Sequence, residues 1–382
     1  MAQTIALITA HDSPNYGSCL QTYATQTLLE KLGFDVVVVD YRRKHTIPRY
    51  SVKRILTEGQ FVKHTPVFKI PGVKALAYLP VYFLVKMRAL PLERFRHQYL
   101  KLSKRMYFSE DDLEKDCPNA DIYITGSDQV WNSTWNNGFE APYYLRFAPK
   151  GACKIAYASS IGKAHFEEWE KGYAYEALSQ YQSISVRESS AIDALSEIGI
   201  TGATSVLDPT LMLEGKEWEA LASNEEVNEP YALVYQLNKN KKMSAYIDAL
   251  LARHHLNGYQ ITYGVHEQTG RAKAVCCPSV QQFLGYFRKA TYVITDSFHG
   301  VVFSVLFQKR FAVILPERFP NRLVDFLAML NLEHRIVDDY QDSKTLFQEI
   351  EYSSVEKALR DERQQSLAFL KKALHVQLDG QS

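Results

Sequence analysis

The segment DSFHG at residues 296–300 follows an apolar run and precedes a pattern typical of a helix, Val301–Phe307. A helix N-terminus at this place exposes backbone N–H groups, which attract phosphate and carboxylate. His299 stands at the helix start, where the helix favours neutral imidazole and a bound phosphate favours the protonated form. Such a histidine can be a general acid or a phosphate partner, and a packed structural histidine fits the same pattern. We expect the turn to contact an anion through three further residues, Ser297, Phe298 and Gly300.

Arg187 follows a second apolar run, in SVRES at residues 185–189. Its planar guanidinium can bind phosphate or carboxylate through two parallel hydrogen bonds. Because Glu188 is adjacent, a structural ion pair at a strand end is the alternative interpretation. Arg322, at the start of another expected helix, is a second cation that could meet an anion or simply begin the helix.

Polar side chains also follow a third apolar run, in GSDQVWN at residues 126–132. Asp128 could accept a proton from an attacking hydroxyl group. We expect Ser127 and Gln129 to hydrogen-bond sugar hydroxyls and Trp131 to stack on a sugar ring. The alternative for this segment is an Asx turn that caps a helix.

The first such turn, HDSPNYGS at residues 11–18, lacks the G-x-G-x-x-G spacing of dinucleotide-binding proteins, so we do not expect NAD. Asn15, Gly17 and Ser18 can still form an anion-binding turn, and we assign them to the acceptor side of the site. Asp208, in the strand-ending LDP, is interpreted as structural.

Short apolar runs rich in Val, Ile and Tyr alternate with helical patterns, which predicts an α/β protein with parallel strands and crossover helices. We expect two doubly wound Rossmann-like lobes around a cleft, because such folds bind ligands at the carboxyl ends of their strands. The predicted units are residues 1–165, 166–342 and a C-terminal helical segment, 343–382, that packs back across the first half. Expected strands of the first lobe are Ile5–Thr9, Asp35–Asp40, Ile122–Thr125 and Lys154–Ala158. Those of the second are Ile184–Val186, Thr204–Leu207, Ala232–Gln236, Tyr259–Thr262, Tyr292–Thr295 and Phe311–Ile314. Expected helices include Gln21–Leu32, Lys241–His254, Val280–Lys289 and Asn321–Leu330.

A basic block between Arg42 and Arg105 is concealed by the overall net charge of +1. It holds sixteen Lys or Arg and two acidic residues, a local charge of +14, which leaves −13 for the rest of the chain. Such a block favours an anionic partner. Charged residues and a proline interrupt its most apolar stretch, Val73–Leu90, so we expect no membrane-spanning helix, which needs about 20 apolar residues. The stretch could lie on an anionic membrane surface, or form two amphipathic helices packed on the domain.

The five cysteines show neither zinc-type spacing nor a redox C-x-x-C, so we expect reduced thiols and no metal. The N-terminus lacks the basic region and long apolar run of a signal peptide. We therefore expect a cytoplasmic protein, and no motif predicts nucleic-acid binding.

Six segments, in this order, resemble the polysaccharide pyruvyl transferase family. They are NYGSCLQTYATQTLLEKLGFDVVVVDY (15–41), DIYITGSDQVWN (121–132), KIAYASSIG (154–162), SVRE (185–188), VLDPTLML (206–213) and VITDSFHGVVFSVLF (293–307). The resemblance runs from about residue 4 to 340 and is weakest over 42–105. Six motifs in one order are specific, whereas any one of them alone is weak.

The resemblance implies a two-lobed fold of the GT-B type, with the donor phosphoenolpyruvate bound mainly by the second lobe. It implies that Arg187 holds the donor's phosphate or carboxylate, and that His299 is the central catalytic or donor-binding group. Some members carry an arginine where Ser297 stands here, so that share of anion binding falls to Arg322 or to the basic block.

The implied activity is transfer of the enolpyruvyl group onto sugar hydroxyls, forming a cyclic ketal in exopolysaccharide, capsule or cell-wall polysaccharide synthesis. No cofactor is implied. The acceptor would be a sugar or a lipid-linked oligosaccharide, which places the protein peripherally at the inner membrane face. Two alternatives stay open: a GT-B glycosyltransferase with a nucleotide-sugar donor, and a non-catalytic subunit of a polysaccharide assembly complex.

Overall fold

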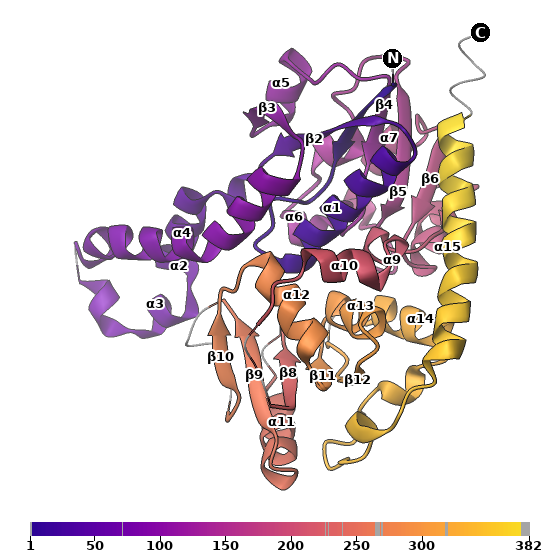
Figure 1. The fold of residues 1–382 in the computed structure, drawn as a ribbon. Helices are drawn as coiled ribbons and strands as arrows, with labels where there is room; N and C mark the ends of the chain where they lie inside the picture. The colour runs from indigo at the N-terminus through magenta and orange to yellow at the C-terminus, as the bar shows by residue number, and fades with distance from the viewer. Residues whose placement is uncertain are drawn as a thin grey trace.

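The structure is a computed structural model that describes residues 2–70, 72–225, 227, 229–238, 240–263, 268, 270–317 and 320–375. It contains two sheets, each flanked by helices, one above the other in Figure 1. The first sheet consists of β1 (Thr4–Ile8), β2 (Asp35–Tyr41), β3 (Leu102–Tyr107), β4 (Ile122–Thr125), β5 (Cys153–Ser159), β6 (Ser183–Val186) and β7 (Thr204–Ser205). The second consists of β8 (Tyr231–Tyr235), β9 (Asn257–Thr262), β10 (Lys273–Cys276), β11 (Tyr292–Thr295) and β12 (Arg310–Val313).

Helices connect and cover these strands. Those of the first lobe are α1 (Tyr16–Lys31), α2 (Pro48–Glu58), α3 (Gln60–His64), α4 (Val73–Tyr99), α5 (Glu110–Lys115), α6 (Ser133–Asn136), α7 (Glu168–Leu178) and α8 (Ser190–Glu197). The remaining ones are α9 (Pro209–Met212), α10 (Gly215–Leu221), α11 (Lys241–Arg253), α12 (Val280–Lys289), α13 (Phe298–Leu306), α14 (Asn321–Met329) and α15 (Tyr352–His375).

Both sheets reverse their strand order at one point, which fixes where a ligand can bind. The orders are β3-β2-β1-β4-β5-β6-β7 and β10-β9-β8-β11-β12, and the strand pairs within the described ranges are parallel. The order reverses between β1 and β4 in the first sheet and between β8 and β11 in the second. Loops diverge at such switch points and leave a crevice outside the carboxyl ends of the strands. The predicted two-lobed α/β fold is therefore confirmed.

Two strands belong to the first sheet, although we expected them in the second. We predicted that Ile184–Val186 and Thr204–Leu207 begin the second lobe, but β6 pairs with β5, and β7 with β6. The first sheet thus extends to Ser205, and the second begins at Tyr231. A short apolar run predicts a strand, but the partner that it pairs with is decided by tertiary packing.

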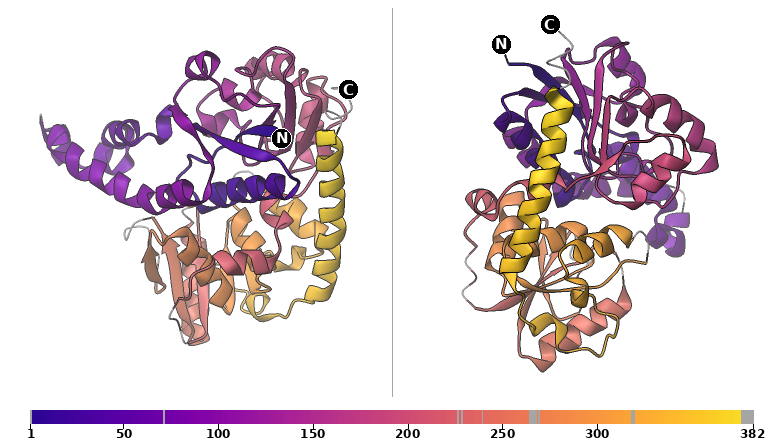
Figure 2. Two further views of the ribbon diagram at one scale, coloured as in Figure 1. Left: turned by 45° about the horizontal axis from the view of Figure 1, so that its top comes forward. Right: turned by 90° about the vertical axis from the view of Figure 1, so that its right-hand side faces the viewer.

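Helix α15 crosses both lobes, as the right-hand view of Figure 2 shows. Leu370 and Leu374 join the core beneath the first sheet, whereas Val355 and Leu359 join the core of the second lobe. The C-terminal helix therefore ties the two lobes together.

Helices α2, α3 and the first two thirds of α4 project from the first lobe between β2 and β3; we call residues 48–90 the helical arm (Figures 1 and 2). We expected interruptions to break the apolar stretch in this arm, but α4 is continuous over 27 residues with Pro80 and Pro91 inside it. Within the described part of the chain, α4 alone is long and apolar enough to cross a membrane, a test that many single helices pass.

Candidate functional site

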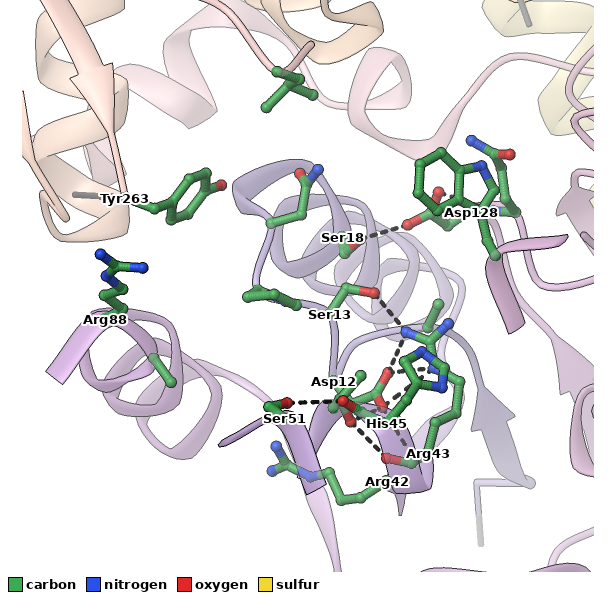
Figure 3. Close-up of a pocket in the computed structure, with 18 of the residues that line it drawn as sticks. Asp12, Ser13, Ser18, Arg42, Arg43, His45, Ser51, Arg88, Asp128 and Tyr263 are labelled. Carbon is green, nitrogen blue, oxygen red and sulfur yellow. Dashed lines mark hydrogen bonds and ion pairs between the residues drawn. The ribbon is translucent and has the colours of Figure 1, made fainter. Parts of the chain in front are cut away.

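A cavity of about 1010 Å³ lies between the lobes, and we call it the interlobe cavity. Its walls include the loops that follow β1, β4, β8 and β11, the four strands at the two switch points. Asp128 and His299 line it from opposite lobes, and residues of α2 and α4 in the helical arm line one side. Figure 3 shows Asp128 on one side and Arg88 of α4 on the other. Its volume is at the upper end for ligand pockets, so it can hold a donor and an acceptor together.

His299 lies in the first turn of α13, because that helix begins at Phe298, earlier than predicted. Ser297 is the N-cap, and its side chain accepts a hydrogen bond from Gly300 N at 3.4 Å. Gly300 packs against β11, where a Cβ atom would lie 2.2 Å from Thr295 Oγ1. Ser297 and Gly300 therefore build the turn that presents His299 to the cavity.

His299 is neutral in the free protein at neutral pH. Burial lowers its pKa to about 4, with a further lowering by the Arg187 charge, against the opposing pull of Asp208. Its Nε2 atom is buried without a hydrogen-bond partner and lies 3.8 Å from Asp208 Oδ2. The imidazole thus carries an unfilled hydrogen-bonding position, in a residue that lines the cavity.

Gly17 allows α1 to approach this histidine. A Cβ atom at Gly17 would lie 2.1 Å from His299 Nδ1, so a larger residue would displace the ring. Asn15 caps α1 by accepting a hydrogen bond from Gly17 N at 2.8 Å. The turn that we assigned to the acceptor sugar thus brings the two lobes together around His299. Asn15 of this turn also lines the cavity.

Arg187 follows β6 and therefore reaches the site from the first lobe, not from the second as expected. Its Nη1 donates to Asp208 Oδ2 at 2.5 Å, and its Nη2 lies 3.6 Å from Asp128 Oδ1. Its Nε and Nη2 atoms are buried without a hydrogen-bond acceptor. Arg187 stands behind the residues that line the cavity, with its guanidinium 5.0 Å from the centre of the Phe298 ring.

Asp208 organises this cluster, although the sequence motif indicated only a turn. Besides Arg187, its carboxylate accepts from Thr210 N at 2.9 Å and so caps α9, which confirms the structural interpretation in part. Burial would raise its pKa, but the nearby Arg187 and His299 outweigh burial and hold the pKa at about 2. Asp208 is thus a buried anion in contact with both predicted functional groups.

Arg322, at the start of α14, lines the cavity, and its guanidinium lies 5.8 Å from the centre of the Phe298 ring. Its Nε is buried and meets no hydrogen-bond acceptor within the described ranges. The carboxylates that influence it, those of Glu188, Asp128 and Asp208, lie beyond ion-pairing distance. Removal from water and the charge of Arg187 lower its pKa to about 10. Arg322 is therefore a cation that faces the cavity without a protein counterion among these carboxylates.

Asp128 faces the cavity in a constrained conformation. Its φ of 77° lies in the left-handed region, which is costly for a residue with a side chain and recurs at functional sites. Ser18 Oγ donates to Asp128 Oδ2 at 2.5 Å, as Figure 3 shows. Burial raises its pKa, but the charge of Arg187 leads the effects that lower it overall. Asp128 is therefore ionised at neutral pH.

The remaining residues of that segment differ in outcome. Gln129 lines the cavity. Ser127 is buried and donates to Asp208 Oδ2 at 3.3 Å, so it supports the cluster from behind. The prediction for Trp131 is wrong, because its ring is buried against Tyr144 and its Nε1 donates to Tyr143 O at 3.1 Å. Such a ring is unable to stack on a sugar.

Much of the basic block near the cavity is already paired. Arg43 lies against Asp12 at 2.8 Å (Figure 3), and Arg42 bonds to Asp40 at 2.5 Å. Within the described ranges, no group of three His, Cys, Asp or Glu residues could hold a metal ion.

Comparisons with known proteins agree with this fold. The structure of S. aureus MnaA with UDP is 11% identical, with a TM-score of 0.50, and the match covers 95% of this chain and 89% of that one. A crystal structure of a UDP-N-acetylglucosamine 2-epimerase is 10% identical, with a TM-score of 0.50 and coverage of 98% and 95%. At these identities, the likeness shows a shared two-lobed fold of the GT-B type.

Among curated proteins, none matches the chain. The model of one family, described as polysaccharide pyruvyl transferase, matches residues 15–318, which is more than half of the chain. The matched residues include every predicted site residue except Arg322. The chain belongs to the polysaccharide pyruvyl transferase family, a family of transferases.

Proposed function

We propose that the protein binds phosphoenolpyruvate against Arg322 and His299 and transfers its enolpyruvyl group onto a sugar hydroxyl. The observation that carries this proposal is Arg322, a cation at the cavity wall whose buried Nε has no acceptor. Arg322 is half-buried, and a cation that is partly removed from water without a partner is costly; a bound anion would offset that cost.

Phosphoenolpyruvate fits this electrostatic setting because it carries a phosphate and a carboxylate on a small alkene. Arg322 and Arg187 lie near the Phe298 ring, at 5.8 and 5.0 Å, so two guanidiniums can act on one small anion. The charge of Arg187 is paired with Asp208 and would act on the donor from behind the cavity wall. Arg322 lines the cavity and can contact the donor directly. The predicted share of Arg322 in donor binding thus becomes the larger one in this proposal.

A bound polyanion would also raise the pKa values of His299, the proposed acid, and Asp128, the proposed base. Negative charge nearby raises the pKa of both imidazole and carboxylate groups. The pKa of His299 would rise from about 4 and allow it to hold a proton beside the donor. Asp128, already ionised, would become a stronger base than it is in the free protein.

The proposed reaction then proceeds without a cofactor. His299 protonates the methylene carbon of phosphoenolpyruvate, and C2 becomes oxocarbenium-like. A sugar hydroxyl attacks C2 while Asp128 accepts its proton. The bond between C2 and the phosphate oxygen breaks, and a second hydroxyl closes the cyclic ketal. Of the two hydroxyl protons, one replaces the proton delivered to carbon and the other leaves with phosphate. The protein contributes positioning and charge stabilisation.

A nucleotide-sugar transferase is the second candidate, favoured by the UDP in the S. aureus MnaA structure. A UDP-sugar would also place phosphates in the cavity. It would in addition need contacts for uracil and ribose. Donor binding separates the two candidates directly.

We expect Arg322→Met to weaken phosphoenolpyruvate binding by about 10- to 150-fold, because hydrogen bonds to charged groups contribute about 1.5–3 kcal/mol. Thermal unfolding with and without donor measures this loss, since a ligand at 100 times its Kd stabilises by about 2.7 kcal/mol. The free variant should be no less stable than the parent protein, because it no longer holds an unpaired cation.

Arg310→Met is the matched control, because Arg310 is a partly exposed arginine that pairs with Glu349 and begins β12, at the strand end away from the cavity. It should keep the full donor response. An unchanged response of Arg322→Met, or stabilisation of the parent protein by UDP- or GDP-sugars but not by phosphoenolpyruvate, would refute the proposed donor site.

A further inference from the structure

The outer face of the helical arm is the most apolar exposed surface that the structure describes. Of the seventeen large hydrophobic residues that are exposed, ten lie between residues 50 and 90. Leu76 is 81% exposed, Met87 64% and Phe83 63%. Contiguous apolar surface of this kind marks an interaction site rather than ordinary protein surface.

Helix α4 carries apolar residues on two opposite faces. Its inner face, with Tyr78, Val81 and Val85, packs against Val52 and Leu56 of α2. Its outer face recurs at helical spacing and points to solvent. The outer face consists of Leu76, Leu79, Phe83, Leu84, Met87 and Leu90. The inner face explains how the arm folds, and the outer face has no covering element among the described residues.

Positive charge surrounds this outer face. Seven exposed cations and one exposed acid, Glu58, lie in the arm. The cations are Arg49, Lys53, Arg54, Lys63, Lys69, Lys74 and Lys86. A second copy of the arm would bring like charges together, whereas an anionic surface would be attracted. An apolar stripe flanked by Lys and Arg is the pattern of a helix that lies in a membrane interface.

The arm is built to lie on a bilayer rather than to cross it. Only the part of α4 before Leu92 is free, because Phe95 and Arg96 are buried in the first lobe, where Arg96 Nη1 donates to His11 O at 2.8 Å. Lys74, Lys86 and Arg88 lie within the free part, and α2 covers its inner face, so it does not offer lipid the predominantly apolar surface that a span of about 20 residues needs.

The interlobe cavity opens beside this arm. Ile55 of α2 and Val85 and Ala89 of α4 line it, and Figure 3 shows Ser51 and Arg88 on the side away from Asp128. The wall of the cavity on the side of the arm is therefore mixed, with apolar and basic side chains.

We propose that the outer face of the helical arm lies on a bilayer containing anionic lipid. Docking follows from the arm's own surface and does not rest on the proposed function. Phe83 and Met87 enter the interface while lysines such as Lys74 contact lipid headgroups.

Flotation of the protein with vesicles tests the docking. We expect binding to vesicles of phosphatidylcholine with phosphatidylglycerol, and little binding to phosphatidylcholine alone. The triple variant Lys63→Glu, Lys69→Glu, Lys74→Glu should lose about 100-fold or more in binding, since each cation near an anionic surface contributes about fivefold. The triple variant Leu79→Ser, Phe83→Ser, Met87→Ser should lose at least about tenfold.

A matched control removes exposed aromatic rings elsewhere, in Trp169→Ser with Tyr175→Ser on α7, and should bind as the parent protein does. Parent protein that stays unbound with anionic vesicles, or an outer-face variant that binds equally well, would overturn the docking. So would a dimer in solution that the outer-face variant converts to monomer, because a second copy would then be the occupant.

Stabilisation by phosphoenolpyruvate, measured without vesicles, reports on the proposed function alone, so the docking and the proposed function can each fail by itself.

Discussion

Replacing His299 by glutamine should lower kcat by about 10²- to 10⁴-fold, the usual contribution of a general acid. Glutamine is close in size and can still hydrogen-bond an anion, so donor affinity should change much less than kcat. The variant should fold, because His299 Nε2 has no partner whose loss would destabilise the protein. Steady-state kinetics at saturating donor measure the effect, and kcat above about a tenth of the parent value would exclude the role.

A proton-linked readout distinguishes an acid from a packed histidine. Because the pKa of His299 is about 4 in the free protein, a bound polyanion that raises it must bring in a proton near pH 6. Calorimetry in buffers of different ionisation enthalpy should show more proton uptake for the parent protein than for His299→Gln. The exposed His165, replaced by glutamine, serves as the control and should change neither kcat nor proton uptake.

Asp208→Asn should lower the free energy of unfolding by about 3–5 kcal/mol, the usual result of breaking a buried ion pair from one side. The variant leaves Arg187 buried without its 2.5 Å partner. Urea unfolding measures the loss. Glu168→Gln, which removes an exposed partner of Lys171, should change stability by less than about 1 kcal/mol.

The stability that Asp208 contributes should decrease as the pH falls. The pKa of the Asp208 carboxyl is ordinarily 3.8 and is about 2 in the folded protein. Between these pH values the folded state therefore binds fewer protons than the unfolded state. The stability difference between parent and variant should therefore be full above about pH 4 and shrink as the pH falls toward 2. A difference below about 1 kcal/mol at pH 7 would mean that Arg187 needs no counterion.

The sequence predicts most strands of this fold because buried parallel strands are continuous apolar runs. It misses β3 (LSKRMY) and β10 (KAVC), because edge strands with exposed residues lack such a run. It also misplaces β6 and β7, whose sheet is determined by pairing with β5 rather than by their own residues. Helix α4 is longer than predicted because its prolines do not end it.

The residues of the site are largely predictable from the sequence, but the positions of their side chains are less so. His299 and Arg187 were expected together, and both contact Asp208, although they come from opposite lobes. Strand-end spacing does not tell which way a side chain points, so Trp131 was misjudged. Asp208 was underestimated because a helix cap and a counterion have the same sequence pattern. Arg322 gains importance only when the structure shows which guanidinium lacks a partner.

A structure of the protein with phosphoenolpyruvate bound tests the central claim most directly. We predict that the donor's phosphate or carboxylate lies within hydrogen-bonding distance of Arg322, and that His299 Nε2 faces its methylene carbon. A donor bound elsewhere, with Arg322 and His299 untouched at saturating concentration, would contradict the assignment.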